Sequence, residues 1–203
     1  MTSKKKKFSS FNQKQAFQQL GISDLHLWQL QTQPRQPSDF FEQRLARLQH
    51  FDLKVSERAK ELLIDAICEE ALEGHDKLKI WKAAPLQSEF IAGEVDYLVA
   101  KKQGYIETPI LCVVEAKKDD FLQGLAQCLV AMQACQWNNQ QSHQAIDIFG
   151  IVTNGDIWKF YKLITSGEVY ETLPYSIIDM AGILGVLDNI FQQCEQHLNL
   201  AQL

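Results

Sequence analysis

The sequence predicts an α/β fold, in which a mixed central sheet carries helices on both of its faces. Apolar runs of strand length, such as Val95–Ala100 and Leu111–Val114, alternate with longer segments whose apolar residues recur at helical spacing. Between residues 57 and 163 the expected order is helix, three strands, helix, two strands. Such alternation is typical of a sheet covered by helices.

Length and composition suit a single domain with a substantial core, because 46% of the 203 residues are hydrophobic. We expect this domain to span residues 38–203, with its centre at 57–163 and a C-terminal helix at 176–198. Residues 1–37 are expected to form a flexible, basic and glutamine-rich segment outside the domain. Within it, a short helix is predicted at Gln13–Leu20, ended by Gly21.

Charge is distributed unevenly along the chain, whose net charge is −5 at pH 7. Residues 1–50 hold eight Lys or Arg and three Asp or Glu, whereas the remainder holds 12 and 22. An acidic body of this kind is not an obvious electrostatic trap for nucleic acid. The Lys4–Lys7 run could contact phosphates, or it could be a solvated tail.

Cysteine usage and hydropathy favour a cytoplasmic protein without a membrane partner. The five cysteines are odd in number and form no Cys-x-x-Cys pair, so we expect reduced, buried thiols. The five histidines are scattered without i, i+4 spacing, which argues against a histidine-based metal site. No apolar run approaches the roughly 20 residues of a membrane span. The basic start lacks the apolar core of a secretion signal.

Two helices are expected before the sheet. The first begins at Ser38, and the second runs from Glu57 to about Glu73, with Ser56 as its N-cap and Gly74 at its end.

Acidic residues gather near the end of the second helix. Glu70 lies at the edge of the apolar stripe and is flanked by Glu69 and Glu73. They could face a site on the sheet, or they could solvate the helix end.

Three strands are expected next. Lys79–Ala84 is the first, followed by Pro85, and Phe90–Gly93 then leads into the strand Val95–Ala100. A polar turn at 101–109 separates that strand from the third, which carries the most informative residues of the chain.

The third strand ends in charge. In Leu111–Lys117, alternation places Glu115 and Lys117 on one face and Ala116 on the other. Charges at the tip of an apolar strand are costly to desolvate unless they are paired or used. If the turn makes a hairpin, Asp96 lies roughly opposite Glu115, with Cβ atoms about 5 Å apart. Two acids so close repel each other, and a divalent metal with oxygen ligands at about 2 Å fits between them.

Glu94 is an alternative to Asp96, because both lie on the same nominal face of their strand. A bulge near Gly93 could decide which of the two reaches the site. Asp96 is preferred because it lies inside the convincing strand.

A helix is expected to follow from Phe121 to about Trp137, capped by Asp119 or Asp120. Gln127 is the polar exception on its face of small residues, and Gln123 lies one turn earlier. Either amide could contact a site on the sheet, or simply lie at a helix edge.

A β-hairpin comes next. Asn154-Gly155 between the apolar runs Ile146–Thr153 and Ile157–Leu163 is a strong hairpin signal. Residues 168–173 could add an edge strand.

The order and spacing of these motifs resemble the PD-(D/E)xK nuclease superfamily. The resemblance covers residues 57–163 and depends on Gly93–Tyr97, on Val114–Lys117, and on the Gln127 amide in the following helix. The hairpin Thr153–Tyr161 is similar to one in type I restriction enzyme nuclease domains and their solitary relatives.

The resemblance implies a restriction-endonuclease-like fold and an Mg²⁺-dependent nuclease, with Mn²⁺ as a substitute, that hydrolyses DNA phosphodiester bonds. Asp96, Glu115, Glu70 and the Ala116 carbonyl would hold the metal. Lys117 would orient or deprotonate the attacking water. Gln127, the remaining candidate site residue, would position Lys117 or a phosphate.

Two other interpretations stay open. The same fold could serve as a non-catalytic module that binds nucleic acid or protein, because the body is acidic. Alternatively, Glu115 and Lys117 could form a structural ion pair in an otherwise ordinary α/β protein. Cutting both strands of DNA would suggest a homodimer or a larger assembly, which the sequence leaves undecided.

Overall fold

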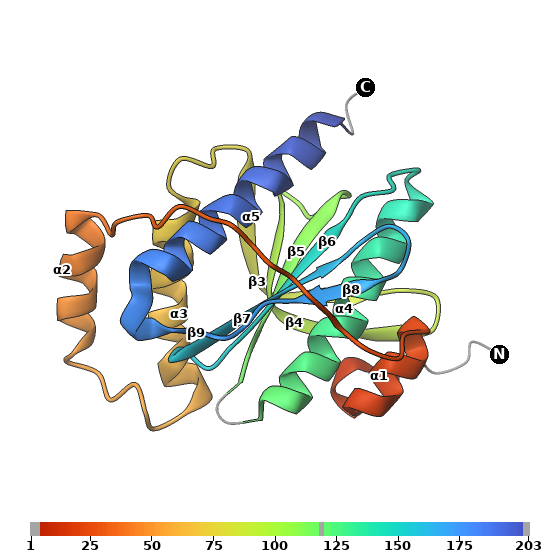
Figure 1. Cartoon of the computed structure of the whole chain (residues 1–203), viewed down its shortest axis with the longest axis horizontal. Coiled ribbons are helices and arrows are strands. Elements are labelled where there is room, and N and C mark those ends of the chain that lie inside the picture. The colour runs from red at the N-terminus through yellow and green to blue at the C-terminus, as the bar shows by residue number, and fades with distance from the viewer. Residues whose placement is uncertain (1–4, 118–119, 201–203) are drawn as a thin grey trace.

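The structure is a computed structural model that describes residues 5–117 and 120–200. Lys4 of the basic run, and Lys118 and Asp119 of the turn before the long helix, lie outside the described residues. The predicted α/β fold is confirmed: a mixed sheet lies between two layers of helices (Figure 1).

The sheet contains nine strands within the described residues. They are β1 (Lys6–Lys7), β2 (His26–Leu27), β3 (Leu78–Gln87), β4 (Ile91–Lys101), β5 (Ile110–Ala116), β6 (Ile148–Thr153), β7 (Ile157–Leu163), β8 (Val169–Glu171) and β9 (Tyr175–Ser176). The order across the sheet is β1-β4-β5-β6-β7-β8-β2, with β3 paired to β4 and β9 paired to β7. β5 and β6 are parallel, whereas the hairpins β3–β4 and β6–β7 are antiparallel.

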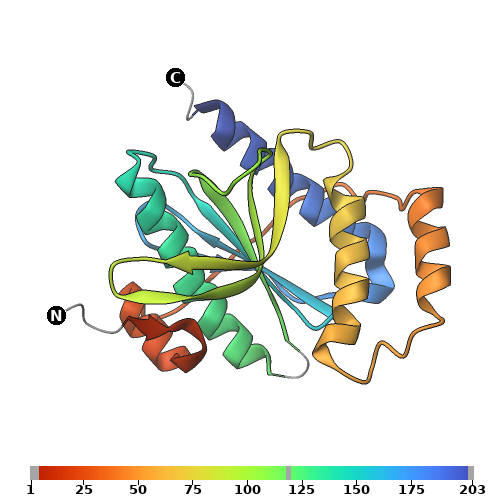
Figure 2. The same ribbon diagram turned by 180° about the vertical axis from the view of Figure 1, so that it is seen from behind.

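Helices cover both faces of the sheet. They are α1 (Gln13–Leu20), α2 (Asp39–Leu48), α3 (Glu57–Leu72), α4 (Phe121–Gln141) and α5 (Met180–Leu200). α1 and α4 lie together on one side and α3 and α5 on the other, with α2 outside α3 (Figures 1 and 2).

Local sequence determines where these helices begin. The side chains of Ser38, Ser56 and Asp120 each accept a hydrogen bond from the backbone N–H three residues ahead, at 3.1, 3.1 and 2.8 Å. Each bond satisfies a donor that the first turn of a helix leaves unpaired. Of the two candidate caps for α4, Asp120 therefore fills the role.

β5 lies at the centre of the core. All of its residues are buried, because β4 and β6 flank its edges and helices cover both faces. A strand that is buried on both faces has a continuous apolar sequence and not an alternation of apolar and polar residues. Glu115, near its end, is therefore carried into the interior.

The two strands before β5 form one long hairpin. The sequence had predicted a short strand at Lys79–Ala84 and a separate segment at Phe90–Gly93 that leads into the next strand. β3 continues from Leu78 through Pro85 to Gln87 and pairs with β4 along nearly its whole length. Pro85 is tolerated because β3 is an edge strand in the described sheet, so a missing N–H on its outer side costs nothing.

The other edge of β4 is shared by two strands. β5 pairs with Tyr97–Ala100, and β1 runs parallel to Ile91 and Ala92. Between these pairings, no strand of the described residues covers the edge of Gly93–Asp96. β4 is therefore open to one side at the residues that the sequence singled out.

The N-terminal segment packs along the domain, contrary to the expected flexible segment at 1–37. Phe8 and Phe11 are buried, the predicted helix α1 packs on α4, and β2 pairs with β8. The segment then crosses the sheet towards α2 (Figure 1). The prediction fails for residues 5–37 because a few apolar side chains in a polar stretch fill sites in the core.

Element ends differ in two further places. α4 continues to Gln141, so part of the expected loop at 138–144 is helical. The C-terminal segment begins as the short strand β9, and α5 starts only at Met180. None of the described helices combines the length and apolar character needed to cross a bilayer.

Candidate active site

Three charged side chains converge where β4 and β5 lie side by side. Tyr97 pairs with Val114, so Asp96 and Glu115 are the next facing residues in the same register. The Asp96 Oδ2 atom accepts a hydrogen bond of 2.7 Å from the Ala116 N–H. Lys117 follows one residue later, so its side chain returns to the face of Glu115.

The Lys117 ammonium lies near both carboxylates. Its Nζ atom is 3.3 Å from Glu115 Oε2 and 3.6 Å from Asp96 Oδ2. The Asp96 side chain is 36% exposed, Lys117 is 17% exposed and Glu115 is 1% exposed. The cluster therefore runs from the solvent at Asp96 into the core at Glu115.

The Glu115 carboxyl group has a raised pKa. Burial, and then the negative charge of Asp96, raise its pKa to about 8, and the Lys117 ammonium only partly offsets this. Its Oε1 atom is buried without a hydrogen-bond partner among the described residues. An unpaired buried polar atom costs about 1–3 kcal/mol, so a further group that bonded to this oxygen would remove that cost.

The backbone is strained beside this cluster. Ala83 in β3, the residue opposite Asp96, has a φ of 48°, a left-handed conformation uncommon for a residue with a side chain. Its ladder pairing with Asp96 is missing, although the pairs on either side are intact. Such strain persists where the surrounding structure imposes it, and it often occurs at functional sites.

α4 supports the stem of Lys117. A Cβ atom at Gly124 would lie 2.9 Å from Lys117 Cγ and 2.8 Å from Val152 Cγ1. Glycine is therefore required for α4 to lie this close to the lysine. The small-residue face of this helix, noticed in the sequence, serves to accommodate the site.

Gln127 lies one helical turn beyond Gly124, on the same side of α4. It lines a groove of about 480 Å³ together with Glu94, Gly93 and the N-terminal residues Lys5 and Lys7. Asp96, Glu115 and Lys117 are not among the residues that line this groove. Glu94, the alternative to Asp96, also lines this groove, whereas Asp96 reaches Ala116 and Lys117.

Glu70 is not brought to the cluster, which corrects the ligand expected there. Its two carboxylate oxygens accept hydrogen bonds from the Ser38 N–H and Oγ–H at 2.7 and 2.8 Å, at the start of α2. Among the described residues, no three Asp, Glu, His or Cys side chains are grouped to hold a metal. Glu69 and Glu73 pair with Arg44 and Arg35 instead.

Glu70 does not reach the cluster because α3 covers the opposite face of the sheet. Asp96 points to the α4 face, whereas Tyr97, the next residue, points to α3 and donates a hydrogen bond of 2.9 Å to Asp65. Sequence spacing placed Glu70 at the edge of a buried stripe, but only the tertiary structure shows that α2 covers that edge.

The remaining donors fit a hard divalent cation in part. Asp96 and Glu115 offer carboxylate oxygens, of which Glu115 Oε1 is unpaired, and Ala116, the residue after Glu115, offers a backbone carbonyl. Mg²⁺ is commonly held by one or two carboxylates, with water and substrate phosphate completing its shell. Two carboxylates are therefore sufficient for a site that a substrate completes.

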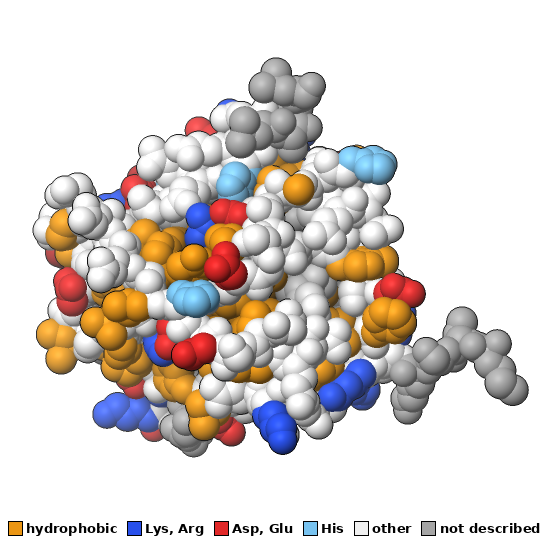
Figure 3. All heavy atoms as spheres, turned by 45° about the vertical axis from the view of Figure 1, so that its right-hand side comes forward, with side chains coloured by type: hydrophobic (Ala, Val, Ile, Leu, Met, Phe, Trp, Pro, Cys, Tyr) orange, Lys and Arg blue, Asp and Glu red, His pale blue; other side chains and the backbone are white. Residues whose placement is uncertain are grey.

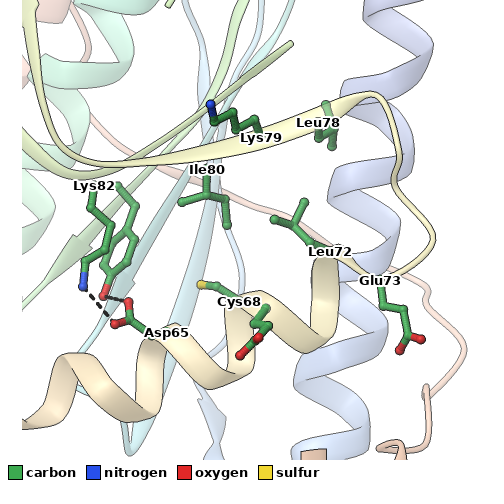
Figure 4. Close-up of a pocket in the computed structure, with 10 residues that line it drawn as sticks. Asp65, Cys68, Leu72, Glu73, Leu78, Lys79, Ile80 and Lys82 are labelled. Carbon is green, nitrogen blue, oxygen red and sulfur yellow. Dashed lines mark hydrogen bonds and ion pairs between the residues drawn. The ribbon is translucent and has the colours of Figure 1, made fainter. Parts of the chain in front are cut away.

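The opposite face of the sheet holds a second cavity, of about 490 Å³, between α3 and β3 (Figure 4). Its Asp65 carboxylate is already bound by Tyr97 and by Lys82 at 2.9 Å each. Cys68 also lines it, and burial raises the pKa of this thiol to about 12. Its other two acids, Glu69 and Glu73, pair with arginines, and its thiol stays protonated, so this cavity offers no comparable chemistry.

No protein-family model matches the chain, and a comparison with curated proteins finds no match either. The resemblance to the PD-(D/E)xK nucleases therefore depends on this chain's own residues.

Proposed function

We propose that the protein is an Mg²⁺-dependent nuclease that hydrolyses DNA phosphodiester bonds, on the pattern of the PD-(D/E)xK superfamily. The observation that carries the proposal is the convergence of Asp96, Glu115 and Lys117 around a buried, unpaired Glu115 oxygen. These three residues suit metal-dependent hydrolysis of a phosphodiester. The two acids can hold a cation, while the lysine orients or deprotonates the attacking water.

Each residue has a separate task in this proposal. Asp96 and Glu115, with the Ala116 carbonyl, would hold Mg²⁺, which when bound would acidify water and polarise the phosphate. Lys117 reaches Glu115 and is partly exposed, so its amine would orient the attacking water or accept its proton. Gln127, in the adjoining groove, would contact the phosphate.

Metal binding is the first test. Calorimetry with Mg²⁺ or Mn²⁺ should detect binding to the wild type that Asp96→Asn loses. Asp65→Asn is the matched control, because Asp65 lies on the other face of the same sheet and binds the neighbouring Tyr97. Equal binding by all three proteins would place the metal elsewhere.

Cleavage of DNA is the second test. Lys117→Ala should reduce the rate by at least about 100-fold, the usual contribution of a positioned acid or base. Lys82→Ala is the control, because Lys82 also pairs with two acids, Glu61 and Asp65, but at the opposite face. A nuclease activity that survives Lys117→Ala and Asp96→Ala would refute the assignment.

One observation favours a second candidate, the non-catalytic module. The Lys117 ammonium already supplies a positive charge beside both acids, and the described residues give no third carboxylate ligand. Such a protein would bind DNA or a protein partner without binding a divalent metal. Calorimetry on the wild type, followed by DNA binding in the absence of metal, separates the two candidates.

We place this activity in the cytoplasm. The five cysteines are unpaired and buried, as expected for thiols in a reducing compartment. Cutting of both DNA strands would suggest a homodimer, which light scattering with and without DNA would detect.

A further inference from the structure

The open edge of β4 separates the candidate active site from a basic strand. β5 ends beside Asp96, and β1 takes its place along Ile91 and Ala92, on the same edge of β4. The four residues Gly93–Asp96 lie between them, a distance of about 13 Å along a strand. β1 therefore forms the far wall of the opening that begins at Asp96.

Alternation divides Lys5 and the two lysines of β1 between two faces. Lys5 and Lys7 line the groove with Glu94 and Gln127, whereas Lys6 does not. The Lys6 ammonium lies 3.7 Å from the centre of the Phe11 ring and donates a hydrogen bond to Gln15. In the described residues, the Lys7 side chain has no hydrogen bond or ion pair.

β1 is held firmly in this place. The Phe8 ring is buried over Gly93, where a Cβ atom would overlap it. Lys5 donates a hydrogen bond of 2.6 Å to the Ser88 carbonyl, and Gln123 of α4 donates one of 3.3 Å to the Ser9 carbonyl. The lysines are therefore presented by a packed strand, which limits the entropy lost on binding.

The charge of this groove differs from that of the rest of the molecule. Two lysines face one acid, Glu94, in a chain whose net charge is −5. On the face seen in Figure 3, Lys and Arg side chains are scattered and form no continuous basic stripe. A local group of lysines in this groove can attract a phosphate backbone to an acidic body.

We infer that β1 is the DNA-binding wall of the candidate active site, with Lys7 contacting a backbone phosphate next to the phosphate at Asp96 and Glu115. The inference is built on the proposed nuclease function, because it names where the substrate strand enters. Glu94 in the same groove opposes this binding, and Lys6, turned to Phe11, takes no part in it.

The test is binding of a short fluorescent DNA duplex of mixed sequence, measured by anisotropy without divalent metal over a range of salt concentrations. Lys7→Gln should reduce the slope of log K against log salt by about 0.9, the value for one lost phosphate contact. As a result, the ratio of wild-type to variant affinity falls about threefold between 50 and 200 mM salt. Glu94→Gln should bind more tightly than the wild type.

Lys6→Gln is the matched control, since it removes the same charge one residue away, and it should bind like the wild type. Equal effects of Lys6→Gln and Lys7→Gln would overturn the inference, because they would show only a loss of net charge. A wild type that binds no DNA at low salt would also overturn it.

The same measurements distinguish a failure of the nuclease proposal from a failure of the basic wall. A wild type that binds DNA through Lys7 but does not cleave it with Mg²⁺ or Mn²⁺ would support the basic wall and reject the catalytic role. Cleavage that depends on Asp96 but is insensitive to Lys7→Gln would support the nuclease and reject the wall.

Discussion

At the scale of single residues, Lys117 determines how much negative charge the site can carry. Above pH 8, where Glu115 is ionised, Lys117→Met should destabilise the protein by about 3 kcal/mol, because it leaves a buried charge without its partner. The double variant Glu115→Gln, Lys117→Met should recover most of this loss. Urea unfolding of the wild type, both single variants and the double variant measures the coupling.

Lys82→Met is the control for this cycle. Its pairs with Glu61 and Asp65 are partly exposed to solvent, so the expected loss is at most about 1 kcal/mol. If the losses of the two single variants simply add in the double variant, Glu115 and Lys117 do not interact and the expectation is wrong.

The raised pKa of Glu115 also predicts a dependence on pH. In the unfolded chain this carboxyl loses its proton near 4.5, but in the folded protein only near 8. Between these values the folded state binds the extra proton, so stability falls as pH rises, by about 1.4 kcal/mol per pH unit. The contribution is complete below pH 4.5 and is lost above 8.

Glu115→Gln should remove this part of the pH dependence. Measured without metal, its stability relative to the wild type should increase steadily from pH 5 to pH 8. A constant difference over this range would mean that Lys117 keeps Glu115 ionised in the folded protein.

The sequence was sufficient to predict that Asp96, Glu115 and Lys117 lie together, because alternation along a strand and the register of a hairpin are local rules. It was not sufficient for Glu70, whose partner Ser38 is 32 residues away. The strain at Ala83 also escaped prediction, because alanine gives no local signal for a left-handed conformation.

At the scale of elements, Asn139 fixes α4 to β5. It is fully buried, and its side-chain amide exchanges two hydrogen bonds of 2.8 Å with the N–H and carbonyl of Ile110, where β5 begins. Asn139→Ala should cost about 2–4 kcal/mol, because two buried backbone groups lose their partners. Chemical denaturation measures this loss.

Asn138→Ala is the adjacent control. Asn138 donates to the carbonyls of Gln87 and Ala134 at a partly exposed position, so water can replace it and a smaller loss is expected. Losses of equal size in the two variants would argue against a clamp at Asn139.

The same asparagines explain why element ends were harder to predict than elements. The polar run after Trp137 resembles a loop in sequence, yet α4 continues to Gln141 because Asn139 is bound to Ile110 of another element. The end of β3 was predicted too early for a similar reason. A proline such as Pro85 ends a strand inside a sheet but is tolerated in an edge strand, and the sequence does not show where the strand lies. The starts of α2, α3 and α4 were predicted well because their caps are local, whereas α5 begins at Met180 and not at 176.

At the scale of the whole molecule, amino-acid composition was the least reliable guide to structure in the N-terminal segment. Its lysines and glutamines suggested a tail, but Phe8 and Phe11 are core residues, and β1 completes one edge of β4. Composition averages over a segment, whereas docking depends on a few apolar side chains. The open edge beside Asp96 exists only because β1 and β5 share β4.

This arrangement makes the integrity of the core depend on residues 5–11. Phe8 is 1% exposed and lies over Gly93, so Phe8→Ala should cost about 3–5 kcal/mol through lost burial and the cavity left behind. For a domain of this size, that corresponds to a decrease in Tm of about 10 °C. Phe90→Ala, at an exposed phenylalanine near β1, should change stability by at most about 0.5 kcal/mol. A Phe8→Ala protein as stable as the wild type would mean that residues 5–11 leave the sheet in solution, and the basic wall beside Asp96 would then be lost as well.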